Sequence, residues 1–389
     1  MTDPKYTVAA SNVGEVRNRG SEQAARRNVT ARAPGPMVSH VSARTEFQDL
    51  LSNPEPILAL APMQDVTDLE FMRLISRYGN ADVYFTEYFR VLPDSRLDPY
   101  ILSSITRNPT GRPVVAQMIG NDIAALVRTA RELQQHPVAA IDLNLGCPVP
   151  IVYRKCAGGG LLRDPQRIDR IVGALREAIE IPFTVKTRIG FDDADVFDEL
   201  LPIFARHSLD LVTVHARTVK EMYRSAPRYE FIARAAEALS CPVLANGNIY
   251  SAHKADEVIA FTGARGLMIG RGVIRNPWLF RQIRERRHGA SIFRPVGRDL
   301  LEYVRALWEA NGTRGIREAA QVQSMKKYMN FIGLGVEPSG AFLHTIRRVN
   351  TKPDFFATCA EFMDHEEPMP LEPFAIPLKE YDVMAGATR

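Results

Sequence analysis

Polar side chains stand at the ends of several short apolar runs, where a packed core does not require them. Gln117 and Asn144 are amides, which carry both a donor and an acceptor for the edge of a flat heterocycle. Lys186 can stabilise a developing negative charge, although a lysine at a strand end can also simply reach solvent. His215 lies two residues before Arg217, and this position favours a ligand contact over the alternative of a buried core histidine.

Two glycine turns follow the last two apolar runs. One is formed by Asn246, Gly247 and Asn248, and the other contains Gly270 and Arg271. Glycine leaves backbone N–H groups uncovered, and the loops after the last two strands of an eight-stranded parallel barrel often hold a phosphate. The two turns therefore predict a phosphate site.

The cysteines are spaced for neither a disulfide framework nor a metal site. There are four of them, without a CxxC pair, so we expect a reducing cytoplasm and no bound metal. Cys147 directly follows an apolar run and is predicted to be packed. Cys156 lies beside Arg154 and Lys155, which would lower the pKa of its thiol, and before three glycines, which would allow motion. Cys156 is therefore predicted to be an exposed acid or nucleophile.

Short apolar runs alternate with amphipathic segments through most of the chain. The runs cover 57–61, 82–86, 113–118, 140–145, 182–187, 209–215, 242–246 and 265–270. Helical patterns cover 122–135, 165–180 and 229–240, and the second begins with Asp164 as the cap and Pro165 in the first turn. Eight continuously apolar strands that alternate with helices predict an α/β fold, the (β/α)8 TIM barrel, with its site at the C-terminal ends of the strands.

The ends of the chain differ from this pattern. Residues 1–45 lack apolar periodicity and are predicted to be a disordered extension, so the catalytic barrel would occupy 46–290. Residues 291–389 are predicted to form a small helical domain, with helices over 297–311, 315–332 and 338–349.

Charge is unevenly placed along the chain. Residues 265–352 hold 17 Lys and Arg against 6 Asp and Glu, whereas the whole chain carries only +4. Such an excess suits a phosphate-rich partner such as RNA, and a solvated helix surface is an equally good explanation from charge alone. No apolar run is long enough to span a membrane, so we expect a soluble, monomeric protein in the cytoplasm.

Seven motifs occur in order between Leu58 and Phe280. They are APMQDVTD, QMIGND, NLGCPVPIVYRKCAGGG, VKTRIG, VHARTVKEMYR, ANGNIYS and MIGRGVIRNPW. Together they resemble the successive motifs of the tRNA-dihydrouridine synthases. The segment TEYFRV and the helical tail are most similar to the bacterial C-type members of that family.

The resemblance implies a barrel that binds FMN and a C-terminal helical domain that binds tRNA. NADPH would reduce the flavin, which would pass hydride to C6 of a uracil in tRNA, and Cys156 would protonate C5. Asn144 and Arg188 would face the uracil. By position in the motifs, the implied cofactor contacts are Pro62, Met63 and Gln64 along the flavin, Gln117 and Lys186 at its ring, His215, and Asn246, Gly247, Asn248, Gly270 and Arg271 at its phosphate.

Two departures from the family pattern and two rival functions remain. Gln64 stands where small residues are common, and the N-terminal extension is outside the pattern. A flavin barrel acting on a free pyrimidine, like the dihydroorotate dehydrogenases, would not need a basic helical tail. An RNA-binding protein with a vestigial barrel would not need Lys186, Cys156 and the phosphate turns.

Overall fold

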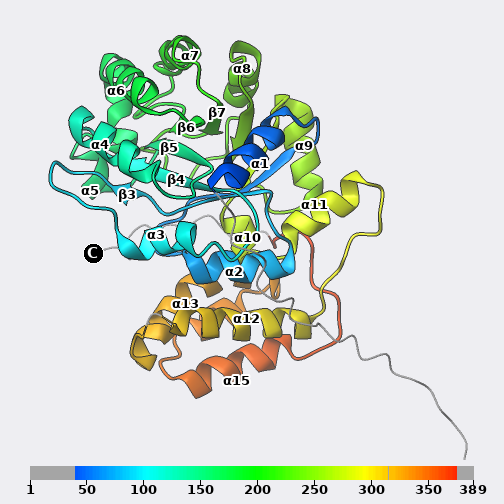
Figure 1. Ribbon diagram of the computed structural model, residues 1–389. Coiled ribbons are helices and arrows are strands. Elements are labelled where there is room, and N and C mark those ends of the chain that lie inside the picture. Colours follow the sequence, from blue (N-terminus) through cyan, green and yellow to red (C-terminus); the bar gives the residue numbers. More distant parts are fainter. Residues whose placement is uncertain (1–39, 314, 375–389) are drawn as a thin grey trace, which may run out of the picture. The chain divides into compact units, whose positions relative to one another are not determined.

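The computed structural model describes residues 40–313 and 315–374, and its core is a sheet of parallel strands closed into a barrel (Figure 1). The strands lie in the order β2-β1-β9-β8-β7-β6-β5-β4-β3, and a pairing between β2 and β4 closes the barrel. They are β1 (Ile57–Leu60), β2 (Val83–Phe85), β3 (Phe89–Arg90), β4 (Val114–Ile119), β5 (Ala140–Leu145), β6 (Phe183–Arg188), β7 (Leu211–His215), β8 (Val243–Asn246) and β9 (Gly266–Ile269). All eight predicted strands are confirmed. The structure adds β3, which was not predicted because two residues are too few to form a recognisable apolar run.

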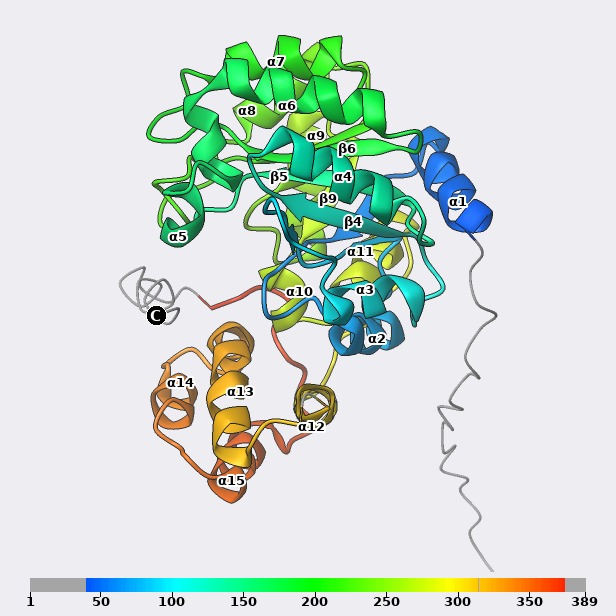
Figure 2. The same ribbon diagram turned by 60° about the vertical axis from the view of Figure 1, so that its left-hand side comes forward.

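Helices follow the strands, and most of them cover the outside of the barrel (Figures 1 and 2). They are α2 (Leu69–Tyr78), α3 (Pro99–Thr106), α4 (Ile123–Leu133), α5 (Pro150–Tyr153), the 3-10 helix η1 (Gly158–Arg163), α6 (Pro165–Ala178), α7 (Phe197–Arg206), α8 (Glu230–Ala238), α9 (Ala252–Thr262), α10 (Arg271–Arg275) and α11 (Leu279–Arg287). The predicted start of α6 is confirmed, because the Asp164 side chain accepts from the backbone N–H of Arg167 and Pro165 is the first helical residue.

Helix α1 (His40–Ser52) precedes the first strand and begins inside the range predicted to be a disordered extension. Ala43 and Phe47 are four residues apart, so they share one face of this helix. Both are buried, and they pack with inward-facing barrel residues such as Ile57, Val83 and Leu211. This packing explains why the helix is ordered before the first strand begins. The rest of the predicted extension, 1–39, lies outside the described residues.

The interior of the barrel changes from apolar to polar along its axis. Its apolar part contains Ala59, Val115 and Leu244. Toward the C-terminal ends of the strands, polar side chains take over, and most of them are buried. These are Gln117, Asp142, Asn144, Arg188, His215 and Asn246. Burying polar groups costs free energy unless they form hydrogen bonds with the protein or a ligand. This end of the barrel is therefore where a functional site is expected.

A helical region follows the barrel and packs against it. It contains α12 (Gly297–Gly312), α13 (Glu318–Ile332), the 3-10 helix η2 (Gly333–Gly335), α14 (Ala341–Ile346) and α15 (Lys352–Met363). The last of these was not predicted. Helix α12 packs on α2, and α13 packs on α10 (Figure 2). The ring of Tyr78 meets those of Trp278 and Tyr303 edge-on, with centroids 5.3 and 5.4 Å apart, so apolar packing is continuous from the barrel into this region.

Candidate active site

Sheet register brings the predicted polar residues of neighbouring strands together. Asn144 on β5 pairs with Lys186 on β6, and Arg188 at the end of β6 pairs with His215 on β7. His215 in turn pairs with Asn246 on β8. Since residues paired across a parallel sheet point to the same face, these side chains form one polar layer at the C-terminal end of the barrel.

The two amides predicted to meet a heterocycle are tied to each other and to a residue outside the predicted set. Asn144 Nδ2 donates to Gln117 Oε1 over 2.8 Å, and Gln117 Nε2 donates to Asp142 Oδ2 over 2.7 Å. The prediction that both amides offer a donor and an acceptor is therefore incomplete for Asn144, because its oxygen already accepts two hydrogen bonds from the backbone, whereas the oxygen of Gln117 accepts one. Asp142 has a signal in the sequence: it is a carboxylate inside the apolar run AIDLNL, two residues before Asn144.

Lys186 is half-buried and is oriented by Asn246. Its Nζ donates to Asn246 Oδ1 over 3.3 Å, and Asn246 Nδ2 donates to the carbonyl of Met268 over 2.7 Å. Burial, and then the positive charge of Arg188, lower the pKa of Lys186 to about 8. The group is thus an ammonium at neutral pH, held where it can stabilise negative charge in a ligand.

His215 is buried and neutral. Burial lowers its pKa well below the ordinary value, and the charges of Arg188 and Lys186 lower it further. Its Nε2 lies 3.2 Å from Nη1 of Arg217. Because a guanidinium can only donate, Nε2 must be the acceptor and the ring proton must sit on Nδ1. His215 therefore offers one N–H donor to its other neighbours.

Arg188 supports the loops around the site. It is 1% exposed, and its Nε donates to the carbonyl of Gly146 over 2.9 Å. Its Nη1 donates over 2.8 Å to the carbonyls of both Thr218 and Met222. The side chain thus links the loop after β5 to the loop after β7. Its expected contact with a uracil remains a prediction, beside this structural role.

The glycine turns after β8 and β9 lie beside a cluster of arginines. Gly247 has φ 129° and Asn248 has φ 47°, so the first turn uses the left-handed region that favours glycine. Arg271 Nη2 lies 3.4 Å from Asn248 Oδ1, and its guanidinium carbon lies 4.3 Å from the centroid of the Tyr223 ring. Burial and the charge of Arg271 lower the pKa of Arg217 to about 10. Such a concentration of positive charge suits an anion.

The loop after β1 holds the next three predicted cofactor residues. Pro62 and Met63 are partly buried and Gln64 is exposed, with its Nε2 donating to Glu87 Oε2 over 3.2 Å. A Cβ on Gly270 would lie 2.9 Å from the sulfur of Met63. Gly270 therefore allows this methionine to approach the end of β9.

The two cysteines near β5 differ as expected. Cys147 is buried beside Ile119 and Val152, and burial raises the pKa of its thiol, which confirms that it is packed. Cys156 is exposed, follows α5, and has a left-handed backbone with φ 51°. The loop that carries it is anchored, because Asn121 Nδ2 donates to the carbonyl of Lys155 over 2.8 Å.

The sequence suggested that the three glycines after Cys156 would allow this loop to move, but the structure shows a different use for them. All three are buried in η1. A Cβ on Gly159 would lie 2.8 Å from the carbonyl oxygen of Cys147, and one on Gly160 would lie 2.4 Å from that of Tyr153. The glycines are therefore needed for close packing, which fixes the loop against the strand end.

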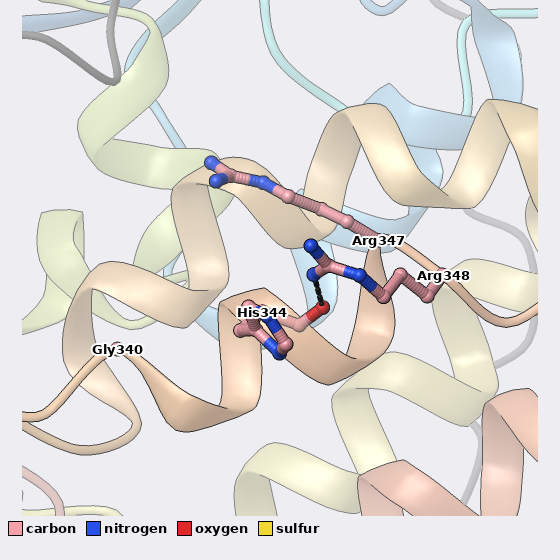
Figure 3. A pocket seen from close by; sticks show the side chains of 4 residues that line it. All are labelled: Gly340, His344, Arg347 and Arg348. Carbon is pink, nitrogen blue, oxygen red and sulfur yellow. Dashed lines mark hydrogen bonds between the residues drawn. The ribbon is translucent and has the colours of Figure 1, made fainter.

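A second basic feature lies in the helical region. A pocket of about 380 Å³ is lined by Gly340, His344, Arg347 and Arg348 (Figure 3). Arg348 Nη1 donates to the carbonyl of His344, and Arg347 Nε donates to Asn330 Oδ1 over 2.9 Å. Within the described residues, no helix is long and apolar enough to cross a membrane. No cluster of His, Cys, Asp or Glu there is arranged to hold a metal ion.

Comparison with known proteins identifies the family. The family model described as dihydrouridine synthase matches residues 59–334. A probable tRNA-dihydrouridine synthase of Rickettsia bellii is 33% identical over 75% of this chain and 90% of its own. The tRNA-dihydrouridine synthase B of Pseudomonas putida is 34% identical, over 78% and 89%. The tRNA-dihydrouridine(16) synthase of the same organism is 34% identical, over 64% and 80%. With a family match over most of its length, this chain belongs to the dihydrouridine synthase family of enzymes, which are oxidoreductases.

Proposed function

We propose that this chain reduces specific uridines of tRNA to 5,6-dihydrouridine, using FMN as cofactor and NADPH as reductant. The observation that carries the proposal is the concentration of cationic and donor groups at the C-terminal ends of β6 to β9. Lys186, Arg217 and Arg271 bring positive charge there, and neutral His215 adds an N–H donor. These groups suit a ligand with a phosphate and an electron-rich ring.

Two groups of residues would hold the two parts of FMN, its phosphate and its ring. Arg271, with the turns Asn246 to Asn248 and Gly270, would hold the phosphate. Gln117, Lys186 and His215 would contact the ring, with Pro62, Met63 and Gln64 along it. The buried hydroxyl of Thr213, which pairs with Lys186 across the sheet, has no hydrogen-bond partner in the part of the chain that the structure describes. Bound FMN would supply the hydride for C6 of the uracil.

The chain's own residues would do the remaining work. Hydride addition at C6 builds enolate-like charge, and Cys156 would donate the proton to C5. Asn144 and Arg188 would hold the uracil. The target uridine must leave its base stack to reach a barrel mouth, so we expect it to be flipped out of the tRNA.

The helical domain, residues 291–389, would bind the tRNA backbone. Exposed Lys327 and Arg348 and partly exposed Lys326 carry positive charge on α13 and just after α14. Arg347 adds to it at the pocket of Figure 3, where His344 is also part of the lining. Phosphate contacts of this kind give sequence-independent affinity, which suits a domain that positions a large RNA.

Cofactor release and flavin reoxidation test this function. The purified protein should be yellow, and heat should release FMN. After reduction by NADPH, tRNA that lacks dihydrouridine should reoxidise the flavin, whereas free uracil should not. Release of FAD would contradict the assigned phosphate site. Reoxidation by free uracil or orotate at the same rate would favour a pyrimidine oxidoreductase instead.

A further inference from the structure

Asp142 lies within β5 and its side chain is fully buried. Its Oδ2 accepts from Gln117 Nε2 over 2.7 Å, and its Oδ1 accepts from the Thr184 hydroxyl over 2.6 Å. The register of the sheet sets up both contacts, because Gln117 on β4 and Thr184 on β6 each pair with Asp142. A buried carboxylate is costly, so its presence beneath the site calls for a role.

The backbone fixes the direction in which these hydrogen bonds run. Asn144 Oδ1 accepts from the N–H groups of Gly146 and Cys147, over 3.0 and 2.9 Å. Asn144 Nδ2 must therefore turn to Gln117 Oε1, and Gln117 Nε2 must face Asp142. An ionised carboxylate can only accept, so Asp142 matches this direction at the far end of the chain of bonds.

This direction decides what the two amides can offer a ligand. Each amide nitrogen has two hydrogens, and the network uses one of each. For the second hydrogens of Gln117 Nε2 and Asn144 Nδ2, residues 40–313 and 315–374 supply no acceptor. Asn144 Oδ1 already accepts two hydrogen bonds. Each side chain therefore has an N–H donor left for a ligand, and Asn144 has no acceptor left, while Gln117 Oε1 accepts only from Asn144.

We propose that Asp142 is a positioning residue for the ligand-binding site. By accepting from Gln117, it holds Gln117 and Asn144 as donors toward the ligand. The site then selects a planar ring whose facing edge carries carbonyl or ring-nitrogen acceptors. The identity of that ring rests on the proposed function, since the pyrimidine portion of FMN and a uracil both carry such acceptors.

Side-chain NMR of the cofactor-free, full-length protein tests the orientation without any ligand. In protein labelled with ¹⁵N-glutamine, the Gln117 resonances are assigned by their loss in Gln117→Glu. We expect one Gln117 amide proton to be shifted to low field by the carboxylate. The shift should disappear in Asp142→Leu and persist in Thr184→Val, the matched control that removes only the other bond to Asp142. Two unshifted Gln117 amide protons in the wild-type protein would overturn the proposal, even if Asp142→Leu failed to fold.

Fluorescence titration with FMN tests the consequence for binding. Asp142→Leu should weaken FMN binding about tenfold, as expected for one misdirected hydrogen bond. Asp142→Asn should stay within about threefold of wild type, because its amide oxygen can still accept from Gln117. Equal losses in both variants would show that charge matters rather than orientation and would overturn the proposal. If the wild-type protein did not bind FMN but kept the shifted Gln117 proton, the proposed cofactor would fail and the positioning role would stand.

Discussion

The carboxyl group of Asp142 has a pKa raised to about 6, because burial penalises its charged form more than its hydrogen bonds and Lys186 favour it. The unfolded chain loses this proton near 3.8, so between these values the folded state holds more protons. Stability must therefore fall as pH rises through this window. We expect Asp142→Asn to raise the free energy of unfolding by about 1–3 kcal/mol above about pH 6, and by almost nothing below about pH 4.

Urea unfolding at several pH values measures this difference. Asp198→Asn is the matched control, because that carboxylate is largely exposed and ion-paired to Arg234. It should give no pH-dependent gain. A gain in Asp142→Asn that was the same at every pH would mean that the carboxyl group is not titrating in the folded state.

We expect substitution of Cys156 to affect the reaction rate and substitution of Cys147 to affect stability. Cys156→Ala should leave the reduction of bound FMN by NADPH nearly unchanged, because that half-reaction does not involve the uracil. Reoxidation by tRNA should slow about 10²–10⁴-fold, which is typical of losing a positioned acid. Cys147→Ala should instead cost about 1–2 kcal/mol of stability, because it removes a packed group.

Stopped-flow reoxidation with tRNA separates the two cysteines. If Cys147→Ala lost this step while Cys156→Ala kept it, the proton donor would be the buried thiol. If both variants kept it, the proton would come from water or from another group.

Residue types and their strand-end positions were enough to predict most of the polar layer. The positions of Lys186 and His215 could be predicted because a polar side chain near the end of a buried barrel strand lies at the C-terminal end of the barrel, whereas their cofactor contacts stay predictions. The prediction could not give the direction of the amide hydrogen bonds of Gln117 and Asn144, since that depends on neighbours 25 and 27 residues apart in the sequence. It also missed Asp142, a carboxylate that lies within the apolar run AIDLNL rather than at its end.

Strands were easier to predict than helix-rich connections. The eight runs are continuously apolar because both faces of a barrel strand are buried. Helices α1 and α15 were missed because their ordering depends on distant partners. Phe47 of α1 packs with barrel residues such as Ile57, and Phe355 of α15 packs on Trp308, with ring centroids 5.4 Å apart. Local periodicity carries little information about such contacts.

The element η1 gives a test of what glycine does beside Cys156. Gly160→Ala would place a Cβ 2.4 Å from the carbonyl oxygen of Tyr153, so the backbone of α5 must shift. We expect a loss of about 1–3 kcal/mol in stability, together with slower reoxidation by tRNA, because α5 leads directly into Cys156. Thermal unfolding and stopped-flow reoxidation measure the two effects.

Gly289→Ala is the control for this change. Gly289 has a left-handed backbone with φ 66°, and a Cβ there would meet nothing within 4 Å. It should cost about 1–2 kcal/mol through backbone strain and leave reoxidation unchanged. If Gly160→Ala kept full reoxidation, the Cys156 loop would tolerate movement and its anchoring would not matter for proton transfer.

Across the whole molecule, fewer of the basic residues in 265–352 are unpaired at the surface than the charge count along the sequence implied. Arg284 pairs with Asp82, Arg286 with Asp256 and Arg298 with Asp364, each within 2.6–2.7 Å. Arg275 is buried and donates to the backbone near residue 371. Counting charges could not distinguish these partnered arginines from exposed ones, because the carboxylates are far away in the sequence.

The packing of the helical region on the barrel also affects how tRNA binding is tested. Phe71 of α2 lies against Tyr328 of α13, and the Tyr303 hydroxyl donates to the carbonyl of Ile274 over 3.1 Å. Removing residues after 290 would expose Phe71 and Trp278 to water. Surface substitutions in the full-length chain therefore give a cleaner result than truncation.

Reversing exposed charges on α13 and just after α14 should weaken tRNA binding without disturbing the barrel. We expect the double variant Lys327→Glu and Arg348→Glu to bind tRNA more weakly and to lower the slope of log affinity against log salt by about 2, one for each lost phosphate contact. FMN content should not change, since neither residue is among the predicted cofactor contacts. The matched control is Arg206→Glu with Arg234→Glu, which reverses two arginines on α7 and α8 that are already ion-paired. Filter binding at several salt concentrations measures both pairs. If the control pair lost tRNA affinity while the helical pair kept its affinity and slope, the tRNA would dock on the outer helices of the barrel instead.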